Sequence, residues 1–314
     1  MRRSAARLVF ALLTAAAVVT AGRTIADQWS AFRASGAVLR PSPALIALSS
    51  VIVLASYAVL VETWRRTVRA WDSDLPWWDA ARIWFVSNLA RYLPGRVWSI
   101  GAMAVLAQRR GVSPLAATGS SIVINLVHLL AGFGLVAVTG AEFFEQRAVA
   151  VALAGALAVA LLLAPRLLPL LGRLAAAVLR RPVEVPRLPD RAIWLAAGGC
   201  LTAWVLYGVA FRIFVAGVIG VAPGGTASYI AAFTGSYLLG YIAVFAPGGI
   251  GARELGLVTA LGRLGLAASG LAGIIALASR LWLTVLEVLP GVLLLALDWA
   301  RAARPPSTDH DPHA

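Results

Sequence analysis

Long apolar runs follow one another along the chain and leave only short polar stretches between them. Runs of about the length that crosses a hydrocarbon core, about 20 residues, cover residues 8–22, 43–61, 112–139, 148–171, 192–218, 227–246 and 266–298. The pattern predicts an all-α polytopic membrane protein with about six transmembrane helices. Little of the chain remains for a soluble domain. We therefore interpret residues 1–304 as one integral membrane domain and the polar, proline-containing residues 305–314 as a disordered cytoplasmic tail.

The composition agrees with this pattern. Of the 314 residues, 60% are hydrophobic and 13% are charged, against about a quarter charged in soluble proteins. A formal charge of +13 would suggest nucleic acid in a soluble protein, but here basic loops set orientation and favour anionic headgroups, so no nucleic-acid partner is expected. The single Cys200 lies in an apolar run and excludes a disulfide framework or a Cys-based metal site. We predict no metal and no cofactor.

The arginines set the orientation. With a cytoplasmic N-terminus, 17 arginines fall on the inner side and five on the outer side, namely Arg23, Arg33, Arg40, Arg147 and Arg263. This is the bias of the positive-inside rule. It predicts a multi-pass protein of the cytoplasmic membrane with both termini in the cytoplasm. The first run is interpreted as an uncleaved helix, with a cleaved signal peptide as the alternative.

This orientation requires two hairpins. Residues 83–108 must enter and leave on the cytoplasmic side, and residues 227–262 on the outer side. The first turns at Pro94-Gly95 and the second at Pro247-Gly248-Gly249. Corresponding breaks that enter from opposite faces predict two re-entrant or broken helix pairs in an inverted repeat, and "YLPGRVWSIGAMAVLAQRRGVSPLAATG" is faintly similar to "FAPGGIGARELGLVTALGRLGLAASG".

The breaks have a chemical use. Non-helical backbone at membrane depth is tolerated where it is buried in protein or lines a cavity. A helix that starts near Gly251 would present N–H groups and the positive end of its dipole, an arrangement that holds phosphate or carboxylate. The alternative is that Pro-Gly marks a surface turn. The two interpretations are more evenly balanced for the first break, because Arg91 and Arg96 bracket it and can extend to an interface.

Charges inside the apolar runs are mostly positive. Five arginines, Arg91, Arg96, Arg212, Arg253 and Arg280, stand against Glu254 and Glu287, and embedded charges tend to mark function. The surplus of positive charge indicates an anionic ligand. Arg280 and Glu287 have a structural ion pair with a neighbouring helix as their alternative role. Asn125 and His128 lie near the middle of their helix and should find interhelical partners, and for His128 we favour packing over proton transfer.

Enzyme signatures are mostly absent. The sequence has no H-E-x-x-H, G-x-S-x-G or G-x-x-x-x-G-K-[ST] motif. Asp72 and Asp74 form one weak exception, an Asp-x-Asp that can hold a hydrated metal and sugar-nucleotide phosphates. No nucleotide-binding domain surrounds it, and we do not expect an enzyme.

Two regions resemble a known family. "RYLPGRVW" followed by "QRRGVS", and "GYIAVFAPGGIGARE" followed by "ASRLWLTVLEVLPG", are similar to the two signature regions of the lysylphosphatidylglycerol synthase transmembrane, or flippase-like, family, over roughly residues 40–298. Tyr92, Pro94, Gly95 and Gly111 match the first pattern. The second pattern is matched by Pro247, Gly248, Gly249, Gly251, Arg253, Glu254 and Arg280.

The resemblance implies a function in lipid movement. Larger members join this membrane region to an aminoacyltransferase domain and move aminoacylated phosphatidylglycerol between leaflets. The synthase activity does not carry over to this chain. Stand-alone members are associated with glycolipid or polyprenyl-linked pathways, which implies a synthase or glycosyltransferase as one kind of partner. Many members have an acidic residue where this sequence has Asn125, which argues against proton coupling there.

The sequence therefore predicts a flippase that moves an anionic phospholipid or glycolipid between leaflets. The alternatives are a membrane-embedded transferase with a lipid-linked substrate and a scaffold for a partner synthase. Both breaks should lie near the bilayer midplane, with Arg253 and Arg91 or Arg96 facing one cavity. The predicted substrate-binding residues are Arg91, Tyr92, Pro94, Gly95, Arg96, Pro247, Gly248, Gly249, Gly251, Arg253, Glu254 and Arg280.

Overall fold

The protein is built from helices. The computed structural model describes residues 39–90, 97–140, 190–243 and 249–302, together with residues 23, 26, 30, 148, 149, 151–157, 159, 160, 163 and 166. Every regular element within these residues is helical. The predicted all-α class is confirmed, and so is a membrane protein with several spans.

Four helices in the described residues are long and apolar enough to cross a membrane. They are α2 (Pro43–Arg69), α5 (Pro114–Thr139), α7 (Asp190–Ile219) and α10 (Ser269–Ala302). Proline occupies the first turn of α2 and of α5, where its missing N–H costs no helical hydrogen bond. The Ser113 hydroxyl caps α5 by accepting from Ala116 N at 3.2 Å. Each of these helices overlaps an apolar run of the sequence, and α2 and α10 continue beyond theirs to Arg69 and Ala302.

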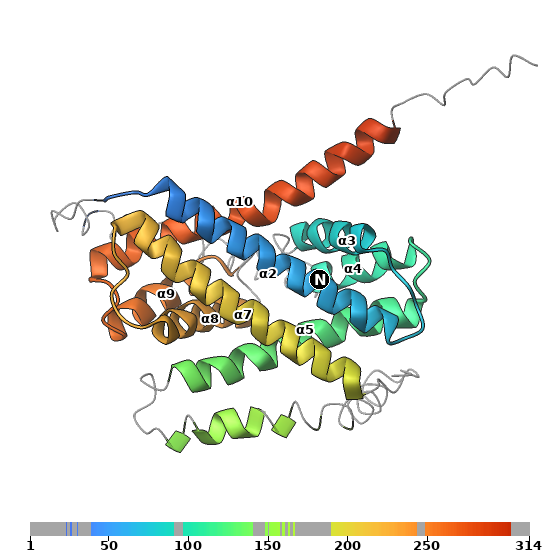
Figure 1. Cartoon of the computed structure of the whole chain (residues 1–314), viewed down its shortest axis with the longest axis horizontal. Coiled ribbons are helices and arrows are strands. Elements are labelled where there is room, and N and C mark those ends of the chain that lie inside the picture. The colour runs from blue at the N-terminus through green and yellow to red at the C-terminus, as the bar shows by residue number, and fades with distance from the viewer. Residues whose placement is uncertain are drawn as a thin grey trace, which may run out of the picture.

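Helices α2 and α7 pack side by side and antiparallel across the middle of the view in Figure 1. The start of α2 meets the end of α7, where Ser42 N–H donates to Gly217 O at 2.7 Å. Near the other end, a Cβ on Gly199 would overlap the hydroxyl of Thr63. Glycine is required there because the two helices approach so closely.

Two pairs of short helices enter this bundle at opposite ends (Figure 1). The first pair, α3 (Trp77–Leu89) and α4 (Val97–Gln108), begins near the end of α2. An ion pair joins Asp79 at the start of α3 to Arg110, which follows α4. Helices α8 (Thr226–Ile242) and α9 (Ala252–Arg263) open where α7 ends. At about 1.5 Å per residue, even α8 is only about 25 Å long, less than a hydrocarbon core of about 30 Å.

Helix α8 of the second pair is shorter than its apolar run predicts. The run at 227–246 is about as long as a complete span, but α8 ends at Ile242. The two pairs lie at opposite ends of the bundle (Figure 1), but their entry from opposite membrane faces stays a prediction. The inverted repeat itself stays a prediction.

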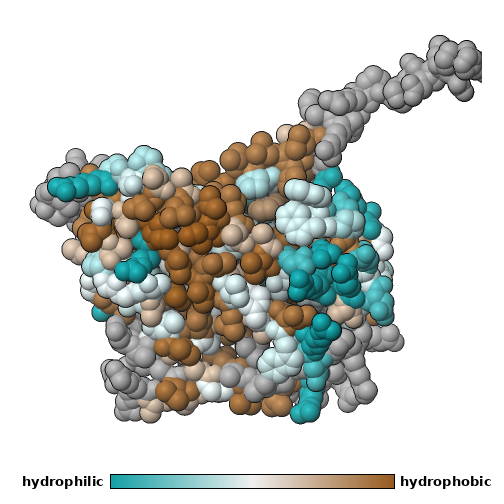
Figure 2. Space-filling view, viewed as in Figure 1, coloured by the Kyte–Doolittle hydropathy of each residue, from teal (hydrophilic) through white to brown (hydrophobic). Residues whose placement is uncertain are grey.

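Aromatic side chains fill the centre. Trp64, Trp204, Phe211, Tyr229 and Phe233 are all fully buried. Trp64 Nε1 donates to Ser120 Oγ at 3.1 Å, which ties α2 to α5. Outside this core, apolar residues cover the middle of the surface in Figure 2, while hydrophilic residues gather toward its two ends. This distribution suits a protein whose flank faces lipid.

Candidate functional site

The α8–α9 break is packed against helix backbone. Gly249 is buried, with φ of 73°, and a Cβ there would lie 2.7 Å from Gly240 O. A Cβ on Gly240 would in turn lie 2.9 Å from Cβ of Arg253. Glycines at these positions let the chain fold back onto α8. Gly249 thus has the burial that the interpretation as a buried break requires, while Pro247 and Gly248 lie outside the described residues.

Arg253 lies buried beside this break. Its residue is 7% exposed, and its guanidinium carbon lies 4.8 Å from the ring centroid of Tyr237 and 5.4 Å from that of Phe233. Both rings come from α8. Among the described residues, Arg253 has no hydrogen-bond or ion-pair partner for its side chain. A buried cation in a membrane costs about 2.5–3.5 kcal/mol on insertion scales, and two aromatic faces offset only part of that.

Glu254 has a different role from its neighbour. Its Oε2 accepts from Gly251 N–H at 2.7 Å, and its Oε1 lies 3.5 Å from Arg280 Nε. The first contact is half of a capping box, since Gly251 has no side chain to complete it. The second ties the first turn of α9 to α10. Glu254 and Arg280 therefore form an ion pair between α9 and α10. A structural ion pair with a neighbouring helix is the alternative role that the sequence analysis gives for Arg280.

The first turn of α9 keeps three donors. Its first helical hydrogen bond runs from Leu255 N to Gly251 O at 2.9 Å, so the N–H groups of Ala252, Arg253 and Glu254 have no partner within the helix. The helix thus begins where the sequence predicts, with Glu254 occupying its outermost N–H group, and anion binding at this terminus stays a prediction.

A polar cavity lies between the two helix pairs. It has a volume of about 60 Å³, which suits a few water molecules. Hydroxyl, amide and aromatic groups from six helices line it: Tyr57, Leu60, Trp84, Ser87, Asn88, Ser99, Met103, Ile124, Asn125, His128, Tyr207, Tyr237 and Tyr241. Helices α3 and α4 flank the first break, and α8 precedes the second. The helices beside both breaks therefore converge on one polar space.

An aromatic stack joins this cavity to Arg253. The His128 and Trp204 rings are stacked with centroids 4.3 Å apart, and Trp204 Nε1 donates to His128 O at 2.9 Å. Tyr237 packs edge-on against Trp204 at 5.2 Å. His128 and Tyr237, two of the residues that line the cavity, thus pack against the same indole ring. Tyr237 lines the cavity and also contacts the guanidinium of Arg253, so the cation lies one ring away from the polar space.

The structure places the predicted residues unevenly. Arg253, Glu254, Arg280, Gly249 and Gly251 gather at the start of α9, as described above. The residues of the first break, Arg91, Tyr92, Pro94, Gly95 and Arg96, lie outside the described part of the chain. Asn125 and His128 line the cavity, and the stacking of His128 on Trp204 agrees with its interpretation as a packing residue.

Sequence reasoning missed the tyrosines. Tyr57, Tyr207, Tyr237 and Tyr241 bring hydroxyl groups to the cavity from three helices. Each lies inside an apolar run, where its ring counts as hydrophobic. A tyrosine in the middle of such a run is nevertheless a signal for a polar site, because its buried hydroxyl usually finds a hydrogen-bond partner.

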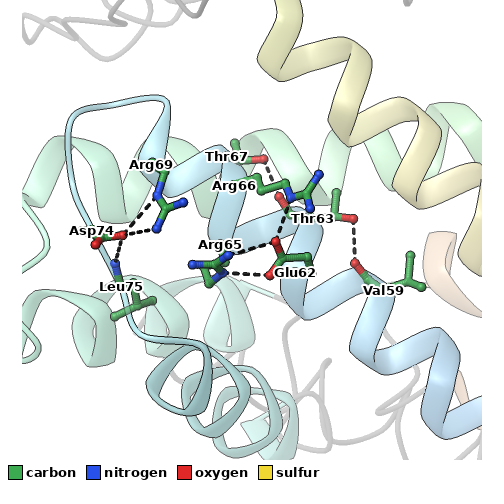
Figure 3. Close-up of polar contacts among 9 residues, drawn as sticks. All are labelled: Val59, Glu62, Thr63, Arg65, Arg66, Thr67, Arg69, Asp74 and Leu75. Carbon is green, nitrogen blue, oxygen red and sulfur yellow. Dashed lines mark hydrogen bonds and ion pairs between the residues drawn. The ribbon is translucent and has the colours of Figure 1, made fainter.

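Two charged groups outside the site are engaged elsewhere. Arg212 donates to Thr226 Oγ1 at 2.7 Å, which ties α7 to the start of α8. Asp74 Oδ1 accepts from Arg69 Nε at 3.1 Å and Nη2 at 2.7 Å, and from Leu75 N at 3.1 Å (Figure 3). These hydrogen bonds from Arg69 hold the pKa of the Asp74 carboxyl below its ordinary value. Asp74 thus closes the turn after α2. Within the last turns of α2 itself, Glu62 pairs with Arg65 and Arg66 (Figure 3).

The chain belongs to a known membrane family. Residues 4–291 match the lysylphosphatidylglycerol synthase TM region. The match extends further toward the N-terminus than the two signature regions do. It assigns the protein to a family with a lipid-related membrane function. No curated protein matched the chain.

Proposed function

We propose that this member of the lysylphosphatidylglycerol synthase TM family moves an anionic phospholipid or glycolipid between the leaflets of the cytoplasmic membrane. One observation carries the proposal: Arg253 is buried at a helix break and lies against two aromatic rings, and Glu254 and Glu287 act on its charge without forming an ion pair with it in the described part of the chain. An embedded charge of this kind marks a site for an opposite charge. A lipid phosphate supplies that charge.

The neighbouring cavity supports a passage for the rest of the headgroup. Glycerol and sugar hydroxyls need hydrogen-bond partners once they leave water. The serine, asparagine and tyrosine side chains around the cavity offer both donors and acceptors. Because no Asp, Glu, Lys or Arg lines the cavity in the part of the chain that the structure describes, the anion would interact with Arg253 while the neutral groups contact the cavity wall.

The present cavity is too small for a headgroup. At about 60 Å³ it holds only water, so passage requires the helices around it to separate. The short helices α4 and α9 are the natural moving parts, since each has 12 residues and follows a break. In inverted-repeat transporters, one repeat moves largely as a rigid body against the other around a central site that broken helices form.

Reconstitution tests the proposal. Purified protein in liposomes with a fluorescent phosphatidylglycerol should make the inner-leaflet label accessible to an outside quencher faster than protein-free liposomes do. Equal rates in both preparations would contradict it. Mass spectrometry of the lipids after incubation separates the alternative, because a transferase changes the mass of a lipid and a flippase does not.

A further inference from the structure

A second, apolar space lies on the lipid-facing side of the α8–α9 pair. This groove has a volume of about 590 Å³ and runs between α5, α8 and α9. Its lining includes Leu239, Ile242 and Leu255, each more than half exposed. In a bilayer the surrounding solvent is hydrocarbon, so an apolar hollow that opens sideways is filled by lipid chains.

The groove has the length of one leaflet. On α8 its lining extends from Ala231 to Ile242, and on α9 from Ala252 to Arg263. Eleven residues of helix span about 16 Å, close to half of a hydrocarbon core of about 30 Å. One end therefore lies at the break, and the other lies at the surface where α8 begins.

The two ends differ in charge. Arg263, in the last turn of α9, is the charged residue among the lining residues. It is exposed and forms no ion pair with the described residues. A phospholipid that inserts a chain into the groove with its methyl end toward the break would place its phosphate at the level of Arg263.

We propose that this groove binds one acyl chain of an anionic phospholipid and that Arg263 holds the phosphate of the same molecule. In the orientation predicted from the arginines, the lipid belongs to the outer leaflet. The site is separate from Arg253, which faces α8 through its two rings. The proposal does not depend on translocation, because it concerns a lipid bound at rest.

Filling the groove gives a direct test. A Cβ on Gly235 would have only Val136 near it, at 3.9 Å, so Gly235→Phe extends into the open space. Gly198→Phe is the matched control, because Gly198 is exposed on α7 with nothing within 4 Å of its Cβ position. Thr259→Phe fills the groove from α9, where Thr259 is exposed, and serves if Gly235→Phe folds poorly.

Native mass spectrometry reads the result. Protein from nanodiscs of mixed phosphatidylglycerol and phosphatidylcholine should retain one phospholipid, mostly phosphatidylglycerol, and Gly235→Phe and Thr259→Phe should lose it while Gly198→Phe keeps it. Arg263→Gln should lower the preference for phosphatidylglycerol by about fivefold, which corresponds to about 1 kcal/mol. Arg40→Gln, an exposed arginine before α2, should not.

Three outcomes overturn the proposal. Retained lipid in both filling variants would place it elsewhere, and an unchanged preference in Arg263→Gln would remove the phosphate contact. A change from dimer to monomer in the filling variants, without bound lipid in the wild type, would show that a second copy occupies the groove. None of these measurements involves transport, so a failed transport assay leaves them interpretable.

Discussion

Replacing Arg253 by glutamine tests the central claim about the site. Glutamine keeps a similar length and hydrogen-bonding capacity but removes the positive charge that lies over Tyr237 and Phe233. A hydrogen bond between charged groups contributes about 1.5–3 kcal/mol, and about 1.4 kcal/mol corresponds to a factor of ten in rate. We expect Arg253→Gln to translocate fluorescent phosphatidylglycerol about 10- to 150-fold more slowly than the wild type.

Stability should change little in the same variant. The substitution loses a desolvated cation–π contact of about 2 kcal/mol, but it also removes a buried charge that costs about 2.5–3.5 kcal/mol. These contributions nearly cancel. Protein yield and melting temperature in detergent should therefore stay close to those of the wild type, which separates a loss of function from a loss of fold.

Two further variants sharpen the test. Arg253→Lys keeps the charge but lacks the planar guanidinium that stacks on rings and binds phosphate through two donors, so its rate should be intermediate. Arg191→Gln removes an exposed arginine at the start of α7 and should be neutral. If Arg253→Gln translocated within a factor of two of the wild type, the anion site would have to lie elsewhere.

Three other measurements check the fold and its orientation. Gly240→Ala should lower the stability by about 1–3 kcal/mol, because its Cβ would lie 2.9 Å from that of Arg253, and Gly198→Ala should not; equal melting temperatures would show that α8 and α9 can separate freely. A cysteine at Ser307 should react with a membrane-impermeant maleimide only after lysis and one at Ser35 in intact cells, against a low background from the buried Cys200; the opposite result would reverse the orientation. Asp74→Asn should lower the melting temperature by a constant amount above about pH 5, and the difference should vanish as the pH falls below about 3.9 toward the lowered pKa of Asp74, whereas a difference that grows in acid would contradict the role of Arg69.

The hydrophobic pattern predicted the long helices well because their ends carry local signals. The runs at 112–139 and 192–218 correspond to helices Pro114–Thr139 and Asp190–Ile219. Proline at the first turn and glycine after the last residue mark α5 in the sequence alone. The run at 227–246 was harder. Its last residues are as apolar as the rest, but the helix ends at Ile242 because the chain must turn back onto Gly240.

The site was only partly predictable. Charge and glycine in an apolar run singled out Arg253, Glu254 and Arg280, but the pattern did not distinguish their roles. That distinction depends on contacts between helices: Arg253 lies on rings from α8, while Glu254 reaches α10. The cavity depends on contacts between residues that are still further apart in the sequence, such as the edge-on packing of Tyr57 against Tyr207, whose ring centroids lie 5.8 Å apart. A single sequence carries no signal for pairs so far apart.

The way in which Arg253 is held decides what competes for it. A phosphate that approached Arg280 would have to displace the Glu254 carboxylate and would leave that carboxylate stranded in a medium with few ions. A phosphate that approaches Arg253 breaks no ion pair, because the groups in direct contact with the cation are the ring faces of Tyr237 and Phe233, while Glu254 and Glu287 act on it from further away. Loading and unloading then leave no second charge exposed at any stage. Of the two arginines, Arg253 is therefore the one suited to bind and release an anionic ligand repeatedly, whereas Arg280 is suited to a permanent ion pair with Glu254.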